Sequence, residues 1–343
     1  MDQHKIELPR IVFVGRGAIE KLPELCKELG LRGRPLVITG ENTRGIAGDR
    51  VAGLLSALKP KLDIAKEASY AEVERIRIAS RGFFDFVIGT GGGKVIDSAK
   101  LLAFEEGAPF ISIPTAPSHD GIASDRVSIT EKNERHSVMV KPPVAILADI
   151  GILSAAPYRM IASGCADIIS NYTPVYDWGL GKKQGEYYSE YAASLSLLSA
   201  EIVMNSTGLI KNREERGIRN LMEALVSSGI AMSLAGSSRP GSGAEHMFSH
   251  ALDAMGSGNM HGEQCGIGAI IMAYMQGSGW KLVRDRLAEV GAPVTAKELG
   301  LSEEMIVKAV LGAKGIRKRH TILDEKPADE KMVLDVCRAV GVL

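Results

Sequence analysis

Hydrophobic and polar positions follow two different patterns along this chain. In the first 150 residues, short apolar runs of strand length alternate with stretches of helix length and helical periodicity. Uninterrupted apolar runs are typical of strands buried on both faces of a sheet. Their alternation with helices predicts a mostly parallel sheet flanked by helices. The predicted strands are residues 11–14, 35–39, 62–65, 84–88, 110–113, 127–129 and 144–149.

The pattern changes near residue 150. Beyond it, β-branched runs almost disappear and long helical windows follow one another, broken by Gly, Ser and Pro. We therefore predict two domains, an α/β domain over residues 1–150 and an all-α domain over residues 151–343. The residues from Thr295 to Glu298 have the spacing of a capping box and predict a further helix directly after them. The other predicted helices of the second domain are 160–172, 186–205, 214–234, 244–255 and 262–276.

The composition is that of a globular protein, since 45% of the 343 residues are hydrophobic and 24% are charged. Lys plus Arg and Asp plus Glu each number 41, so the formal net charge is zero. A neutral chain has no overall field that would concentrate nucleic acid or an anionic membrane. We expect neither as a partner.

Cysteine usage and apolar run lengths indicate a cellular compartment. The four cysteines are far apart and form no CxxC pair, which favours a reducing environment over a disulfide framework or a zinc ribbon. The first residues lack the apolar segment of a signal peptide. The apolar run 266–275 is too short to span a bilayer. We therefore expect a cytoplasmic protein without membrane insertion.

A glycine-rich turn follows one of the predicted strands. Gly91, Gly92 and Gly93 separate the apolar run 86–88 from a helix that begins near Lys94. Consecutive glycines let the backbone turn tightly and approach a ligand closely, and the N–H groups at a helix start suit a diphosphate. A tight strand–helix turn without any ligand fits the glycines equally well. The pattern is neither the first-turn GxGxxG of a standard Rossmann unit nor a P-loop.

The residues around this turn resemble a known superfamily. Residues 91–94, with Asp97 and Lys100, are similar to the GGGxxxDxAK signature of the iron-containing alcohol dehydrogenase, glycerol dehydrogenase and dehydroquinate synthase superfamily. The resemblance implies a Rossmann-like α/β domain that binds NAD(H) or NADP(H), followed by an all-α metal-binding domain. It also places Asp120 against the substrate. The cofactor-binding residues that it implies are Gly93, Lys94, Val95, Ile96, Asp97, Thr115, Ala116, Pro117, Ser118 and Ser124.

The second domain contains a group of potential metal ligands. His246, His250 and His261 lie within sixteen residues of one another, whereas the other four histidines are scattered. Each histidine alone is more often structural, but the cluster together with Asp167 favours a metal site. His246 and His250 are separated by one helical turn and share a helix face. Spacing alone therefore nominates both as ligands.

The superfamily resemblance implies a narrower ligand set. It assigns the metal to Asp167, His246 and His261, and places Asp167 and His250 next to the substrate. The iron enzymes carry a His four residues after the metal-binding Asp, where this chain has Asn171. Three protein ligands leave coordination positions open for a substrate, as in catalytic zinc sites. We therefore expect zinc rather than iron.

Four stretches are most similar to the archaeal-type sn-glycerol-1-phosphate dehydrogenases, and the resemblance covers essentially the whole chain. It implies reduction of dihydroxyacetone phosphate to sn-glycerol 1-phosphate, the backbone of glycerophospholipids, by a homo-oligomeric enzyme. The four stretches are PTAPSHDGIAS (114–124), SGCADIISN (163–171), SRPGSGAEHMFSHALD (238–253) and MHGEQCGIG (260–268).

The chemistry of that reaction suggests roles for individual residues. The ketone and hydroxyl of the substrate can chelate zinc, which stabilises charge on the oxygen as hydride arrives from the nicotinamide. His250 or Asp120, acting through water, is expected to supply the proton, and these two are the candidate catalytic residues. Arg239 is a candidate for the phosphate, although a solvated loop arginine before Pro240 is an equally good interpretation.

The residues after the predicted strand 35–39 bear on the choice of nucleotide. Glu41 would repel a 2′-phosphate and Arg44 would pair with it, so we expect NADH and NADPH both to be accepted.

Three other functions remain open from the sequence. One is a glycerol dehydrogenase or another polyol dehydrogenase, and the second is a lyase of the dehydroquinate synthase kind. The third, a non-catalytic nucleotide sensor, is disfavoured by the complete set of predicted metal ligands.

Overall fold

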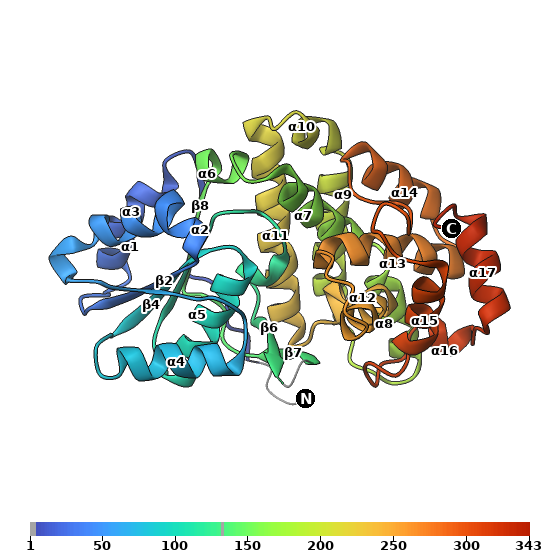
Figure 1. Ribbon diagram of the computed structural model, residues 1–343, viewed down its shortest axis with the longest axis horizontal. Coiled ribbons are helices and arrows are strands. Elements are labelled where there is room, and N and C mark those ends of the chain that lie inside the picture. The colour runs from blue at the N-terminus through green and yellow to red at the C-terminus, as the bar shows by residue number, and fades with distance from the viewer. Residues whose placement is uncertain (1–4, 132–133) are drawn as a thin grey trace. The chain divides into compact units, whose positions relative to one another are not determined.

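The computed structural model describes residues 5–131 and 134–343 (Figure 1). Residues 1–4 and 132–133 lie outside the described part. The first four belong to the N-terminal stretch for which we predict no signal peptide. The chain forms two compact units, Met1–Pro157 (unit 1) and Tyr158–Leu343 (unit 2). A parallel sheet with flanking helices in unit 1 and the helices of unit 2 confirm the predicted fold class. The assignment of nucleotide binding to residues 1–150 and of metal and substrate binding to residues 151–343 stays a prediction.

Unit 1 is built on a six-stranded parallel sheet, because its short apolar runs can bury both faces only between two helical layers. Val37 and Ile88 face a core that includes Leu22 of α1 and Val51 of α3, whereas the neighbouring Gly89 lies against Ala99 of α5. Figure 1 accordingly shows α1 and α3 on one side of the sheet and α4 and α5 on the other. In sheet order, the strands are β1 (Ile11–Gly15), β8 (Ala145–Asp149), β5 (Phe110–Pro114), β4 (Phe86–Gly91), β2 (Pro35–Thr39) and β3 (Lys61–Ile64).

Short helical segments connect these strands. They are η1 (Ala18–Lys21), α1 (Leu22–Glu28), α2 (Glu41–Thr43), η2 (Arg44–Gly48), α3 (Asp49–Leu54), η3 (Ser56–Leu58), α4 (Tyr70–Ser80), α5 (Gly93–Glu105), η4 (Asp120–Ile122) and α6 (Ile150–Ser154). The helix α4 begins where Ser69 caps it by accepting a hydrogen bond from the Glu72 N–H (3.1 Å).

One predicted strand lies outside the parallel sheet. Residues 127–129 belong to β6 (Arg126–Glu131), which pairs antiparallel with β7 (Glu134–Met139) in a separate two-stranded sheet. The residue pattern of β7 did not predict a strand there. Strands so close in the chain pair antiparallel, because a parallel neighbour needs a long crossover connection.

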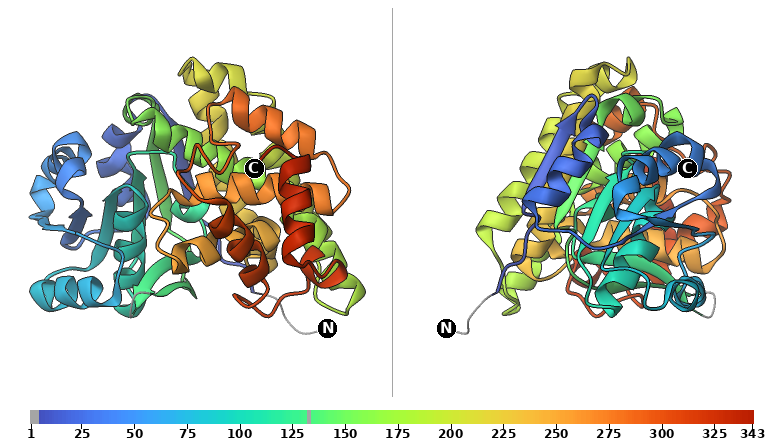
Figure 2. Two further views of the ribbon diagram at one scale, coloured as in Figure 1. Left: turned by 45° about the vertical axis from the view of Figure 1, so that its right-hand side comes forward. Right: turned by 90° about the vertical axis from the view of Figure 1, so that its left-hand side faces the viewer.

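In unit 2, every regular element of the described residues is helical (Figure 2). α13 runs through its centre and packs against both α7 and α12. Apart from the cap Met260, nearly every residue of α13 is buried, which explains why its sequence shows little polar alternation. The helices are α7 (Tyr158–Ser170), α8 (Pro174–Lys183), α9 (Glu190–Met204), α10 (Thr207–Lys211), α11 (Glu215–Ala235), η5 (Arg239–Gly241), α12 (Ala244–Ala254), α13 (His261–Met275), α14 (Trp280–Glu289), α15 (Glu303–Ala313), α16 (Ile322–Glu325) and α17 (Glu330–Ala339).

The predicted capping box forms its hydrogen bonds but does not start a helix. The Glu298 carboxylate accepts from the Thr295 N–H (2.9 Å), and the Thr295 hydroxyl accepts from the Glu298 N–H (3.2 Å). These bonds close an isolated turn, because Gly300 then adopts a positive φ of 68°. The next helix, α15, begins only after its own cap, Ser302.

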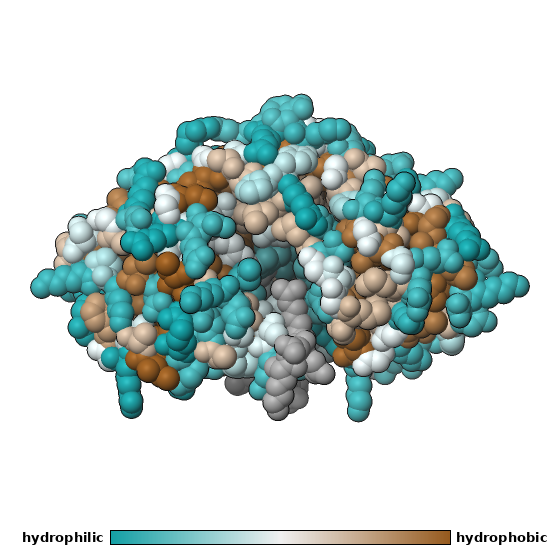
Figure 3. Space-filling model, in the orientation of Figure 1, coloured by the Kyte–Doolittle hydropathy of each residue, from teal (hydrophilic) through white to brown (hydrophobic). Residues whose placement is uncertain are grey.

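On the face drawn in Figure 3, several separate groups of hydrophobic residues lie among hydrophilic ones in each unit. All four cysteines are buried and free. Within residues 5–131 and 134–343, no helix has the length and apolar character needed to cross a membrane.

Candidate active site

The glycine turn joins β4 to α5, and each of its glycines meets different surroundings. A Cβ on Gly91, the last residue of β4, would lie 2.8 Å from the Cβ of Val95. Gly92 caps α5, and a Cβ there would enter open space. A Cβ on Gly93 would lie 2.1 Å from Nε2 of His119. None of the three glycines has a positive φ, so close approach rather than a left-handed turn explains them.

This turn lies where the strand order of the sheet reverses. From β2 the chain continues to β3 on one side, whereas β4 leads through α5 to β5 on the other. Open parallel sheets bind ligands outside the carboxyl ends of their strands at such a point. The Thr43 hydroxyl accepts from the Gly40 N–H (2.9 Å) and lies 3.4 Å from the Thr90 carbonyl oxygen, so it ties the loop after β2 to β4. The N-terminus of α5 at this edge suits a diphosphate.

The predicted cofactor residues lie on two joined segments, the first turns of α5 and the loop after β5. The Thr115 N–H donates to the Gly91 carbonyl (3.0 Å) and connects the two segments. Val95 and Ile96 are buried. Asp97 is also buried, and its carboxylate accepts from a backbone N–H of β6 (3.1 Å). Their role in cofactor binding stays a prediction.

A buried lysine holds the loop that carries Asp120 and Ser124. Lys100 of α5 is 1% exposed, and its ammonium donates to the carbonyls of Gly121, Ser124 (2.9 Å) and Arg126 (2.9 Å). Three ammonium donors thus meet three acceptors. Burial lowers the pKa of Lys100 to about 8, although nearby aspartates oppose this shift. In the sequence Lys100 is only part of a signature, and the structure identifies it as the residue that fixes this loop.

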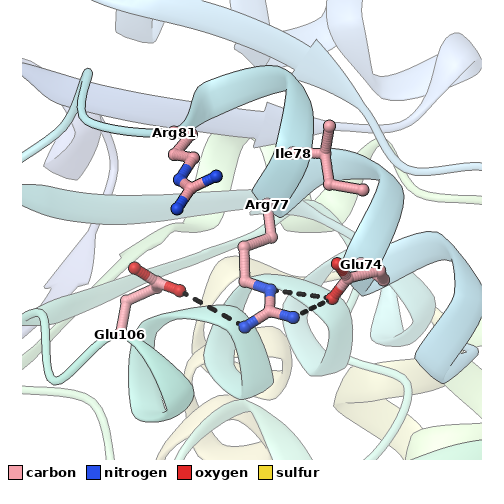
Figure 4. A pocket seen from close by; sticks show the side chains of 5 residues that line it. All are labelled: Glu74, Arg77, Ile78, Arg81 and Glu106. Carbon is pink, nitrogen blue, oxygen red and sulfur yellow. Dashed lines mark hydrogen bonds and ion pairs between the residues drawn. The ribbon is translucent and has the colours of Figure 1, made fainter.

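A surface depression of unit 1 is lined by Glu74, Arg77, Ile78, Arg81 and Glu106 (Figure 4). It is formed by the end of α4 and the end of α5, which lead into the starts of β4 and β5. Arg77 lies between Glu74 and Glu106 and forms ion pairs with both. Because its charges compensate one another and it lies at the amino ends of the strands, this depression does not fit a nucleotide site.

Three helices of unit 2 bring the predicted metal ligands together. The Nε2 atoms of His246 on α12 and His261 on α13 each lie 3.8 Å from Oδ1 of Asp167 on α7. The sulfur of Cys265, one turn after His261, lies 3.5 Å from His261 Nε2. All four ligand atoms lie within 4.8 Å of one another. Ligand atoms around tetrahedral zinc lie about 3.3–3.8 Å apart when the bonds are about 2.0–2.3 Å long. The donor set therefore fits a zinc ion after small side-chain shifts.

Glycines allow these helices to approach closely enough. A Cβ on Gly262 of α13 would lie 1.9 Å from the carbonyl oxygen of Ser163 on α7. A Cβ on Gly268 would lie 2.8 Å from the carbonyl oxygen of Glu245 on α12. Both contacts are with backbone atoms, which cannot swing aside as a side chain can. The glycines of the MHGEQCGIG stretch therefore set the distances between the helices that carry the ligands.

Hydrogen bonds fix the ring orientation of both histidines. The buried Glu245 carboxylate lies 2.8 Å from Nδ1 of His246 and holds the proton there, which leaves Nε2 as the metal-binding atom. The Ser249 hydroxyl donates to Gln264 Oε1 (2.6 Å), so it accepts from Nδ1 of His261 (3.0 Å). Both Nε2 atoms face Asp167 Oδ1, each at 3.8 Å. No role for Glu245, Ser249 or Gln264 was predicted from the sequence.

Protonation in the metal-free cluster is set by burial and by close neighbours. Burial disfavours the charged ring of His246, but Cys265 and Glu245 raise its pKa well above the usual 6.5. Burial raises the pKa of Cys265 to about 11, so its sulfur is a thiol at neutral pH. A metal ion must therefore displace protons when it binds here.

His250 lies beside the cluster and is not one of its four members. Its ring centroid lies 5.8 Å from that of His261, and its Nε2 lies 3.2 Å from Nη2 of Arg317. Spacing along α12 nominated His246 and His250 equally, whereas the geometry groups only His246 with Asp167. The role of His250 toward the substrate stays a prediction. Asn171, at the position of the iron-enzyme histidine, donates instead to the Ser228 hydroxyl (2.9 Å).

Arg239 is neither solvated nor open to a phosphate. Its side chain is 5% exposed and forms an ion pair with Glu186. Its Nη1 also donates to the His320 carbonyl (3.0 Å). The interpretation of Arg239 as a solvated loop arginine is therefore wrong. Its charge is already compensated, which argues against it as the phosphate-binding residue.

Comparison with known proteins places this geometry in a family. The profile of the iron-containing alcohol dehydrogenases matches residues 13–157. A glycerol-1-phosphate dehydrogenase (NAD(P)+) from Methanosarcina acetivorans is 47% identical over 324 residues, which cover 93% of this chain and 91% of the relative. One from Pyrococcus horikoshii is 46% identical over 346 residues, which cover 99% and 100%.

The chain belongs to the glycerol-1-phosphate dehydrogenase family. The family resemblance found in the sequence is thus confirmed.

Solved structures of more distant proteins share the fold. A probable glycerol dehydrogenase from Sinorhizobium meliloti superimposes with a TM-score of 0.82 at 20% identity and covers 98% of both chains. Glycerol dehydrogenase from Schizosaccharomyces pombe gives 0.81 at 21% identity, covering 99% of this chain and 91% of that chain. At these identities the likeness concerns the fold alone.

Proposed function

We propose that this chain reduces dihydroxyacetone phosphate to sn-glycerol 1-phosphate with NADH or NADPH, at a zinc ion held by Asp167, His246 and His261. The observation that carries the proposal is the arrangement of this cluster, in which two histidine Nε2 atoms face one carboxylate oxygen at 3.8 Å. The substrate and the nucleotide are supported by the name of the relatives, which are 46–47% identical over most of the chain.

The parts of the chain have distinct tasks in this reaction. When bound, zinc supplies a Lewis acid that stabilises negative charge on the ketone oxygen, and the nicotinamide supplies the hydride. Glu245 and Ser249 keep the ligand histidines in the correct tautomer. Asp120 and His250 are the two candidates for moving the proton through water. The first turns of α5 and the loop after β5 are the candidate binding surface for the nucleotide.

A substrate comparison tests the proposal directly. We expect NADH or NADPH oxidation with dihydroxyacetone phosphate to exceed that with unphosphorylated dihydroxyacetone by about 100-fold or more in kcat/KM, because a site built for a charged group is penalised when that group is missing. The measurement is the loss of absorbance at 340 nm. A preference for the unphosphorylated ketone would favour a polyol dehydrogenase instead.

The nucleotide preference is proposed to be permissive. Glu41 is exposed at the start of α2, and Arg44 pairs at the surface with Asp49 (3.0 Å), so an acidic and a basic group both lie beyond β2. Strict refusal of NADPH at saturating concentration would contradict this part of the proposal.

Assembly and location are proposed from the sequence and the family resemblance alone. We expect a homo-oligomer in the cytoplasm, since near-zero net charge does not oppose association. Light scattering that gives the monomer mass at micromolar concentration would contradict the oligomer.

A further inference from the structure

We propose that the thiolate of Cys265 is a fourth protein ligand of the metal ion in the substrate-free enzyme. This assignment rests on the proposed function, in which three side chains hold zinc, and deepens it by completing the ligand set. Cys265 lies within the stretch MHGEQCGIG (260–268), but no role for it was predicted from the sequence.

The position of Cys265 along α13 directs its sulfur toward the cluster. Cys265 follows His261 by four residues, so the two side chains share one helix face and lie one turn apart. The next residue, Gly266, lies at the contact with α7, where a Cβ would be 3.3 Å from the Cβ of Ala166. Because Asp167 directly follows Ala166, this close packing brings the thiol near the carboxylate.

The distance between sulfur and nitrogen matches that of two ligands on one ion. Sγ of Cys265 lies 3.5 Å from Nε2 of His261. In a tetrahedral zinc site with bonds of about 2.3 Å to sulfur and about 2.0–2.1 Å to nitrogen, these two atoms lie about 3.5 Å apart. The carboxylate oxygen of Asp167 is 3.8 Å from the same nitrogen, slightly more than the corresponding spacing of about 3.3–3.5 Å. Relative to His261, the cysteine is therefore closer to ligand geometry than the aspartate is.

The surroundings of the sulfur are those of a ligand. Cys265 is fully buried, at 0% exposure, and its sulfur lies within 4.8 Å of a ligand atom on each of the other three members of the cluster. A buried cysteine often serves as a small hydrophobic side chain. An apolar role does not explain a sulfur that faces two imidazoles and a carboxylate, whereas ligation of a shared ion does. The thiol gives up its proton as the ion binds.

A thiolate ligand is compatible with catalysis and has a consequence for metal choice. Catalytic zinc sites include ones with cysteine ligands, and the ion can expand from four to five ligands during a reaction. A fourth protein ligand thus leaves the substrate able to reach the same ion. A soft thiolate favours zinc over ions such as Mn²⁺ that prefer oxygen ligands. Cys265 should therefore strengthen zinc binding selectively.

The test is the absorption spectrum of the enzyme loaded with Co²⁺ in place of zinc, without substrate. A thiolate bound to Co²⁺ gives a sulfur-to-metal charge-transfer band in the near ultraviolet. We expect this band in the wild type and its loss in Cys265→Ala. Cys337→Ala, which removes an equally buried thiol from α17, should keep the band. Cobalt bound to the wild type without the band would overturn the inference, even if Cys265→Ala does not fold.

Metal affinities separate ligation from a structural role. Cys265→Ala should lower zinc affinity about 10–100-fold or more, since the loss of even an indirect partner of a metal site has such an effect. Affinity for Mn²⁺ should change less than about threefold, because this ion gains little from a thiolate. Cys337→Ala should leave both affinities unchanged. An equal fall for the two metals would overturn the inference. The proposed function fails separately, if the wild type binds no zinc or does not prefer the phosphorylated ketone.

Discussion

The two candidate sites of this protein are built from different kinds of atoms. In unit 1, the nucleotide edge consists mainly of backbone groups: a glycine turn, a helix N-terminus and loop carbonyls that Lys100 holds in place. In unit 2, the cluster consists of side chains from three helices, and glycines act only by letting these helices approach. A backbone-built site depends on local conformation, whereas a side-chain cluster depends on packing between distant segments. The two sites should therefore respond differently to substitution.

The largest difference between the responses of the two sites should come from Asp167→Ala. Loss of the carboxylate that faces both histidines should empty the site and lower turnover about 1,000-fold or more, since Lewis-acid stabilisation contributes several kcal/mol. Nucleotide binding, measured by fluorescence, should persist because it is assigned to unit 1. Chelation should have the same effect, and zinc should restore activity better than iron. Full activity in a preparation shown by elemental analysis to be metal-free would refute the site.

Substitutions of the two α12 histidines test which side chains of unit 2 bind the metal. His246→Ala should weaken zinc binding about 10–100-fold or more, because it removes a predicted ligand that Glu245 orients. His250→Ala should keep zinc but lower turnover, because its ring lies outside the four-membered cluster. Zinc content and kcat of the two variants, measured side by side, decide between these roles. Equal loss of metal would show that both residues are ligands.

Helix packing can be tested without touching a ligand. Gly262→Ala places a methyl group against the Ser163 carbonyl and should cost about 1–3 kcal/mol of unfolding free energy, with weaker zinc binding. Gly179→Ala is the matched control, since a Cβ at this position of α8 meets no atom within 4 Å. It should stabilise the protein by about 0.5–1 kcal/mol. Denaturant unfolding and zinc titration provide both readouts. Unchanged zinc affinity in Gly262→Ala would show that the helix spacing is not critical.

The smallest expected effect is a change in the pH dependence of the unfolding free energy when Lys100 is replaced. Burial lowers its pKa to about 8, below the ordinary value of 10.5, so the folded protein binds fewer protons than the unfolded chain between these values. The free energy of unfolding should therefore gain a rising contribution from pH 8 to 10.5. This contribution should be absent in Lys100→Met and present in the exposed control Lys94→Met. Parallel pH profiles of Lys100→Met and wild type would contradict the assignment.

Most of the fold was predictable because its signals are local. The apolar run Pro35–Thr39 forms β2 with the predicted bounds, and the helix predicted at residue 244 begins there. The errors occur at elements whose structure depends on neighbouring residues that the hydrophobic pattern does not report. Residues 126–131 pair with β7 instead of joining the parallel sheet, and the bonds of Thr295 close a turn that Gly300 prevents from becoming a helix. Helix α8 was not predicted, although Pro174 stands at its first turn.

The sequence by itself determined which residue types are available for the site: a glycine turn before a helix, and an aspartate with several histidines in a helical domain. Only the tertiary structure decided which of them meet. Lys100 reaches carbonyls up to 26 residues later, Ser249 sets the tautomer of His261, and Arg317 lies against His250 across 67 residues of chain. A residue pattern reports local conformation and burial, whereas hydrogen bonds and ligand geometry depend on side chains that only packing brings together.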